Sequence, residues 1–200
     1  IATNVAASAG SVVWNSLDVP SSAQAFWRVV SQSNPAIATT NEKPFSLNNT
    51  PLAYYVNDAS TDGDVYSIAP GSPDNDGFTD FTPVDSIQTI INRYDLQPGD
   101  RILVDTGSYD LDSPVTIDVS KYTGVVTNPL QIIGSTNMAA GGTRINRKNG
   151  VVAFQFNRVN AVTLSHFSIT NAVVGVRMNS STNMVLEWLD IKGAGTGIEL

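Results

Sequence analysis

Apolar and polar positions repeat about every 22 residues from Val152 to Leu200. The positions that match from one line to the next are Phe154, Val176 and Ile198; Phe156, Met178 and Leu200; Leu164 and Leu186; and Ile169 and Ile191. Each line holds two strand-like stretches separated by a polar turn. A period of about 20 to 30 residues with strands and no helix is typical of a solenoid, in which each turn buries its inward side chains against the next.

Strands are predicted throughout the C-terminal half of the chain. Within the repeats they cover residues 152–156, 162–169, 174–178, 184–191 and 196–200. Upstream, shorter β segments are predicted at 101–105, 114–119, 129–133 and 143–146, and a further strand at Tyr54. In the first of these segments Ile102 and Val104 alternate with other residues and therefore point to the same side.

One helix is predicted, over residues 83–95. Thr82 is a suitable N-cap, Pro83 suits the first helical position, and Asp85 places an acid in the first turn. An apolar face at helical spacing is formed by Val84, Ile87, Ile90, Ile91 and Tyr94. The helix ends before the Pro98-Gly99 turn.

Residues 1–50 predict a separate, smaller β segment. Its expected strands are Ser11–Trp14, Ala25–Val30 and Pro44–Leu47, separated by clusters of Pro, Ser and Asn. Three strands alone do not close a sandwich. The stretch WNSLDVPSSAQAFWRVVSQSNPAIATTNEKPFSLNN resembles the last strands of immunoglobulin-like modules of secreted and cell-wall proteins.

From Tyr55 onward the chain resembles the start of a pectate-lyase-like right-handed parallel β-helix. The resemblance is carried by PDNDGFTDFTPVDSIQTII, LQPGDRILVDTGSY and PLQIIGS, in this order. It implies an all-β fold: a right-handed parallel β-helix with an N-terminal capping α-helix, preceded by a small immunoglobulin-like β-strand segment. The expected domains are 1–50, the end of the immunoglobulin-like segment; 51–100, the β-helix cap; and 101–200, β-helix turns that are incomplete at the C-terminus.

The composition of the chain excludes several kinds of partner and binding site and favours one cellular location. Charged residues make up only 14%, the net charge is −7 and the pI is about 4.4, with no cluster of Lys or Arg, so nucleic acid is not an expected partner. No apolar run approaches the roughly 18 residues of a membrane span. Cysteine is absent and His166 is the only histidine, which excludes disulfides and multi-histidine metal sites. The low charge and the many Ser, Thr and Asn residues predict an extracellular or cell-surface protein.

Gln155, Arg177 and Glu199 are predicted to point outward, one above the other, because they alternate with inward positions. The family resemblance implies that such a sheet face binds an acidic polysaccharide, with Arg177 and Glu199 as weak catalytic candidates. The alternative is a cross-strand ion pair between Arg177 and Glu199 on a solvated face. Since one Glu beside one Arg does not supply the clustered acids of lyase chemistry, no catalytic group is predicted within these residues.

Two further places could carry chemistry. Asp74, Asp76 and Asp80 surround a Gly turn and could hold calcium, the only cofactor suggested by the sequence; turn-forming Asp without metal is the alternative. His166 and Trp188 occupy equivalent places in successive lines, which favours a stack at a bend over a catalytic histidine. Glycosylation acceptor patterns begin at Asn48 and Asn179.

Two functions are therefore expected. The first is a secreted or cell-surface β-helix protein with a structural, adhesive or filament-forming role. The second is a polysaccharide lyase or glycoside hydrolase of the pectate-lyase-like group, with its active site beyond residue 200; a carbohydrate-binding module is a third option. Because the last repeat is unfinished, we expect either a longer chain or a subunit whose open end is covered by another copy, and polysaccharide or other copies as partners.

Overall fold

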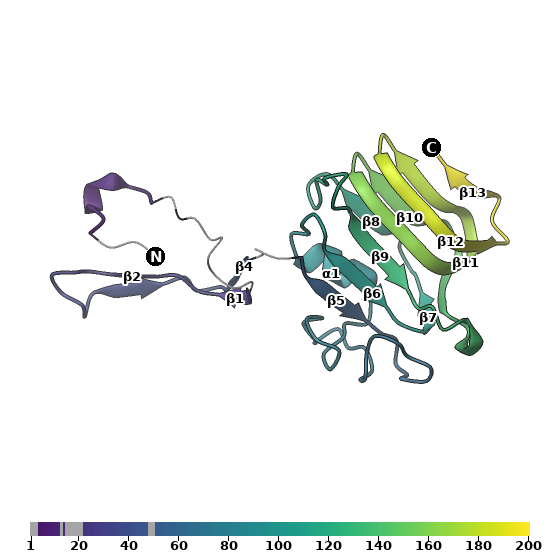
Figure 1. The fold of residues 1–200 in the computed structure, drawn as a ribbon, viewed down its shortest axis with the longest axis horizontal. Helices are drawn as coiled ribbons and strands as arrows, with labels where there is room; N and C mark the ends of the chain where they lie inside the picture. Colours follow the sequence, from purple (N-terminus) through teal and green to yellow (C-terminus); the bar gives the residue numbers. More distant parts are fainter. Residues whose placement is uncertain (1–3, 13, 15–21, 48–50) are drawn as a thin grey trace. The chain divides into compact units, whose positions relative to one another are not determined.

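The computed structural model describes residues 4–12, 14, 22–47 and 51–200. The chain divides into two compact units, Ile1–Thr50 and Pro51–Leu200. Both units are built mainly of strands, and the second contains a large parallel sheet and the only α-helix of the described residues (Figure 1).

Unit 1 contains two small antiparallel sheets. Its elements are the 3₁₀ turn η1 (Ala7–Ala9) and the strands β1 (Ser22–Ala25), β2 (Arg28–Val30), β3 (Ala38–Thr40) and β4 (Phe45–Leu47). β1 pairs with β4, and β2 pairs with β3. The predicted strand at Ala25–Val30 is in fact two strands, because Trp27 turns its N–H to the Asn41 side chain. Residues 11, 12 and 14 form no strand, so that prediction is wrong there, and residue 13 lies outside the described residues.

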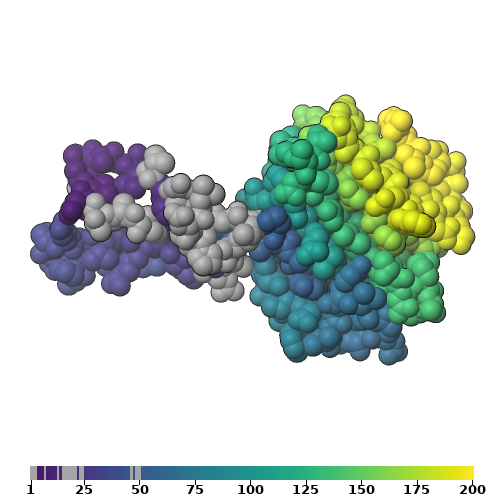
Figure 2. Space-filling view, viewed as in Figure 1, coloured from purple at the N-terminus to yellow at the C-terminus, as the bar shows by residue number. Residues whose placement is uncertain are grey.

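Unit 2 is one parallel sheet with a short helix. Its elements are β5 (Ala53–Val56), α1 (Ile87–Arg93), β6 (Arg101–Val104), β7 (Gly107–Asp110), β8 (Val115–Asp118), β9 (Leu130–Gly134), η2 (Met138–Ala140), β10 (Thr143–Asn157), β11 (Asn160–Asn179), β12 (Thr182–Lys192) and β13 (Thr196–Glu199). Of these strands, β7 was not predicted. Figure 2 shows the colour passing across this unit from blue to yellow, so that successive segments lie side by side.

The strands of unit 2 form three parallel ladders. The first ladder joins β5, β6, β9 and the first parts of β11 and β12. The second joins β7, the start of β10, the middle of β11 and the end of β12. The third joins β8, the end of β10, the end of β11 and β13. The long strands therefore bend between ladders, and the bends include left-handed residues such as Asn149, His166 and Asn171.

The predicted repeat is confirmed by the strand register. Phe154 pairs with Val176, which pairs with Ile198. The other matched pairs are Phe156 with Met178, Leu164 with Leu186, and Ile169 with Ile191. Phe154 and Val176 are fully buried. Leu200 does not fit the prediction, because it lies beyond β13 and is 91% exposed.

The helix is shorter than predicted. α1 begins after Ser86, whose Oγ accepts the Thr89 N–H at 3.1 Å, so Ser86 and not Thr82 is the N-cap. Val84 pairs with the sheet and not with the helix. It forms a parallel bridge with Val56, and its N–H donates to the Tyr55 carbonyl at 3.0 Å. The buried face of the helix, Ile87, Ile90 and Ile91, is as predicted.

Each ladder has its first strand covered on the outer edge. In the first ladder, the Tyr55 N–H donates to the Gly77 carbonyl at 2.8 Å. In the second, the Ser108 N–H donates to Asp58 Oδ2 at 2.9 Å. In the third, the Thr116 N–H donates to Gln88 Oε1 of α1 at 2.7 Å. One backbone donor of each first strand is thus satisfied at this end of the sheet without another strand.

Candidate functional site

The structure places Gln155, Arg177 and Glu199 in one column of the third ladder. Arg177 Nε and Nη2 each donate to a carboxylate oxygen of Glu199 at 3.0 Å, which makes the pair bidentate. Gln155 donates to Asn157 Oδ1 at 3.2 Å. The predicted placement and the predicted ion pair are confirmed. The positive charge of Arg177 is balanced by the carboxylate of Glu199. Carbohydrate binding at these three residues stays a prediction.

Arg177→Ala is expected to lower the free energy of unfolding by less than about 1 kcal/mol, because the side chains of the pair are 25% and 42% exposed and water screens their attraction. The measurement is urea unfolding of Arg177→Ala, Glu199→Ala and the double variant. A coupling energy above about 2 kcal/mol in this cycle would contradict the assignment of a weak surface pair.

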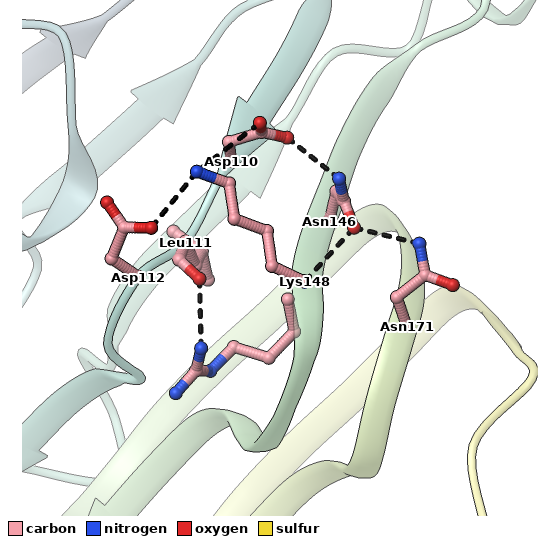
Figure 3. Close-up of polar contacts among 7 residues, drawn as sticks. Asp110, Leu111, Asp112, Asn146, Lys148 and Asn171 are labelled. Atoms are coloured by element: carbon pink, nitrogen blue, oxygen red, sulfur yellow. Dashed lines mark hydrogen bonds and ion pairs between the residues drawn. The ribbon is translucent and has the colours of Figure 1, made fainter.

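Amide side chains form columns that the prediction missed. Asn146 donates to Asp110 Oδ1 at 2.8 Å and accepts from Asn171 Nδ2 at 2.9 Å (Figure 3). In the third ladder, Asn179 donates to Asn157 Oδ1 at 2.8 Å. A sequence signal existed for the latter pair, because Asn157 and Asn179 occupy matching places in successive repeats. These amides link neighbouring strands at the bends.

A small charged cluster lies at the same bend as Asn146. Lys148 Nζ lies 3.0 Å from Asp112 Oδ1 and 3.6 Å from Asp110 Oδ2 (Figure 3). The hydrogen bond that Lys148 donates to Asp112 raises the pKa of Lys148 above its usual value. Arg147 from the same strand donates to the carbonyl of Leu111 at 2.9 Å. Each cation is therefore held by the protein itself.

His166 and Trp188 are stacked, as predicted. Their ring centroids are 6.0 Å apart with an interplanar angle of 20°. Both residues have left-handed backbone, with φ of 64° and 53°, which is uncommon for bulky side chains. His166 Nδ1 is buried and has no hydrogen-bond partner among the described residues. The geometry is that of a stacked bend, and within the described part of the chain no hydrogen bond or ion pair joins the His166 ring to the acid or base that a catalytic histidine needs.

The predicted calcium ligands take part in the hydrogen bonds of local turns. Asp76 Oδ1 accepts the Phe78 N–H at 3.1 Å and the Thr82 hydroxyl at 2.7 Å. The Asp74 N–H donates to Ser72 Oγ, and the Asp80 carbonyl accepts the Ile68 N–H. Within residues 4–12, 14, 22–47 and 51–200, no group of three or more His, Cys, Asp or Glu side chains is arranged to hold a metal ion. Calcium binding at Asp74, Asp76 and Asp80 stays a prediction.

A hollow of about 310 Å³ lies between α1, β7 and the segment after β5. Its acidic lining consists of Asp58, Asp85 and Asp110. Two of these carboxylates are engaged, since Asp58 accepts the backbone N–H groups of Ser60 and Ser108, and Asp110 contacts Asn146 and Lys148. Most of the acids of the hollow are therefore held in internal hydrogen bonds or ion pairs.

Comparison with models of protein families, with characterised proteins and with solved structures finds no match to this chain. In the part of the chain that the structure describes, no helix is long and apolar enough to cross a membrane.

Proposed function

We propose that the chain is part of a right-handed parallel β-helix, capped by α1 and preceded by the end of an immunoglobulin-like segment, and that it has a structural, adhesive or filament-forming role outside the cell or on its surface. The all-parallel pairing of three ladders supports the β-helix, since connections between parallel strands of one sheet are almost always right-handed. The covered outer edges of β5, β7 and β8 support the cap.

The observation that carries the functional proposal is the internal pairing of outward polar side chains. Asn146 with Asp110, Asn179 with Asn157, and Arg177 with Glu199 each link neighbouring strands. Side chains held in this way stabilise the stack. Such a surface suits a stiff scaffold.

Other copies of the chain are the proposed partners, with polysaccharide as the alternative. In the described residues β12 and β13 each pair with β11 on one side and with no strand on the other. A strand from another copy, added there in register, would extend the ladders and cover inward side chains such as Leu186 and Ile191. Because the opposite end of the stack is covered, two copies joined at these edges would form a dimer, and a filament would require a second contact elsewhere on the chain.

The alternative function is that of a polysaccharide lyase or glycoside hydrolase whose active site lies beyond residue 200. Polygalacturonate and alginate are the test polymers. We expect no rise in the ultraviolet absorbance of unsaturated products, no new reducing ends, and self-association that increases with protein concentration in sedimentation experiments. Product formation by the wild type that is lost in Glu199→Gln would overturn the structural role and place chemistry on the third ladder. Tight binding without cleavage would favour a carbohydrate-binding module.

A further inference from the structure

Residues 57–84, here called the strap, follow β5 and return to cover its free edge. The Asn57 N–H donates to the Val84 carbonyl at 2.9 Å, which joins the two ends of the strap. The Tyr55 carbonyl accepts the Val84 N–H at 3.0 Å. The edge of the first ladder is therefore protected only while the strap is closed.

One anchor of the strap is the buried carboxylate of Asp105, directly after β6. It accepts the N–H groups of Val65, Tyr66 and Ser67 at 2.6, 2.9 and 2.6 Å. Asp105 is fully buried. Three consecutive backbone donors of the strap thus depend on one acidic side chain.

The second anchor is the side-chain amide of Asn57, which is also fully buried. Its Nδ2 contacts three acceptors of the strap: Asp64 Oδ2 at 2.6 Å, the Ala69 carbonyl at 2.9 Å and the Ser60 carbonyl at 3.0 Å. Asp64 Oδ1 is buried and has no hydrogen-bond partner among the described residues. The closed strap therefore holds a carboxylate with one oxygen bonded and one oxygen unsatisfied.

The charged neighbours of Asp64 make this arrangement unfavourable for an anion. The groups that act on it are Asp58 and Asp62 of the strap and Asp105 after β6, and the phenol of Tyr109 on β7 is also close enough to be influenced by it. Burial is the main cause that raises the pKa of Asp64 from 3.8 to about 6; the three carboxylates add to the rise, and the hydrogen bond from Asn57 opposes it. A proton on Asp64 would remove the repulsion.

We propose that the strap is an acid-tightened closure, in which protonation of Asp64 removes its repulsion with the neighbouring carboxylates and favours the closed state, whereas ionisation of Asp64 loosens the strap and exposes the edge of β5. This proposal concerns regulation of the fold and does not depend on the proposed function. The sign follows from linkage: the closed state binds the proton more tightly than the open state. Closure therefore strengthens as pH falls from about 7 through 6 towards 3.8, and this gain is lost as pH rises through about 6, with no further change expected in the alkaline range.

Amide hydrogen exchange of Val65, Tyr66 and Ser67 tests the closure, after correction for the intrinsic dependence of exchange on pH. In the wild type, the opening equilibrium constant is expected to fall by up to about tenfold between about pH 7 and pH 5. Asp64→Asn, a neutral side chain of the same shape, is expected to be more protected than the wild type at about pH 7 and to show little further change towards pH 5.

Asp74→Asn is the matched control, because Asp74 is an exposed carboxylate of the same strap and is not one of the carboxylates that act on Asp64. It should follow the wild type. An unchanged opening constant in the wild type, or the full pH response in Asp64→Asn, would overturn the proposal. Protection that depends on added calcium and disappears with a chelator at about pH 7 would show that a cation and not a proton closes the strap, and would overturn it as well. If Asp64→Asn fails to fold, the pH dependence of the opening constant in the wild type decides: a fall towards pH 5 supports the proposal, and a constant value overturns it.

Discussion

Asp105→Ala is expected to lower the free energy of unfolding of unit 2 by about 3 to 5 kcal/mol. The carboxylate is fully buried and accepts the Val65, Tyr66 and Ser67 N–H groups and that of Thr106, so the truncated side chain leaves four backbone donors without their acceptor. Each unsatisfied buried donor costs roughly 1 to 3 kcal/mol, and opening of the strap limits the total. Urea unfolding followed by circular dichroism measures the loss.

Two controls make this result specific. Asp105→Asn keeps one acceptor oxygen and should show a smaller loss than Asp105→Ala. Asp62→Ala removes an exposed carboxylate of the strap and should change the free energy of unfolding by no more than about 0.5 kcal/mol. Equal, small effects of all three variants would show that the strap contributes little to the stability of the unit.

The second large effect is expected for Phe154→Ala, at about 3 to 5 kcal/mol. Phe154 is fully buried, lies between Val115 and Val176 in the third ladder, and packs against Phe167 with ring centroids 5.4 Å apart. Removal of the ring leaves a cavity between ladders that the rigid strands cannot close. The thermal midpoint should fall together with the free energy of unfolding in urea.

Phe81→Ala is the matched control, because Phe81 is 67% exposed. It should lie within about 0.5 kcal/mol of the wild type. A loss at Phe154 no larger than the loss at Phe81 would show that the interior between the ladders is not the stabilising core that its burial indicates.

The register of the last strands could be predicted because their inward residues recur in phase. Phe154, Val176 and Ile198 keep the same place relative to the next strand, so periodicity alone determines the pairing. The start of the helix could not be predicted in this way. Thr82 and Pro83 form a good local start signal, but the sheet uses Val84 to cover Val56, and the backbone cannot serve both purposes.

The buried anchors of the strap also lay beyond sequence reasoning. Asp105 bonds to residues about 40 positions away, and nothing in the local pattern distinguishes it from the turn-forming acids around it. In the candidate site, too, one part could be predicted from the sequence and another could not. The column of Gln155, Arg177 and Glu199 followed from strand alternation, whereas the contact of Asn146 with Asp110 joins two strands outside the regular repeat.

The shrinking distance along the chain between paired strands has a consequence for folding. Tyr54 and its partner Ile102 are 48 positions apart (102 − 54), whereas Val176 and its partner Ile198 are 22 apart (198 − 176). Closing the longer loop costs about 0.7 kcal/mol more in chain entropy. Folding is therefore expected to propagate from one repeat to the next as in a one-dimensional array, with nucleation favoured among the later repeats and the first ladder step near β5 completed last.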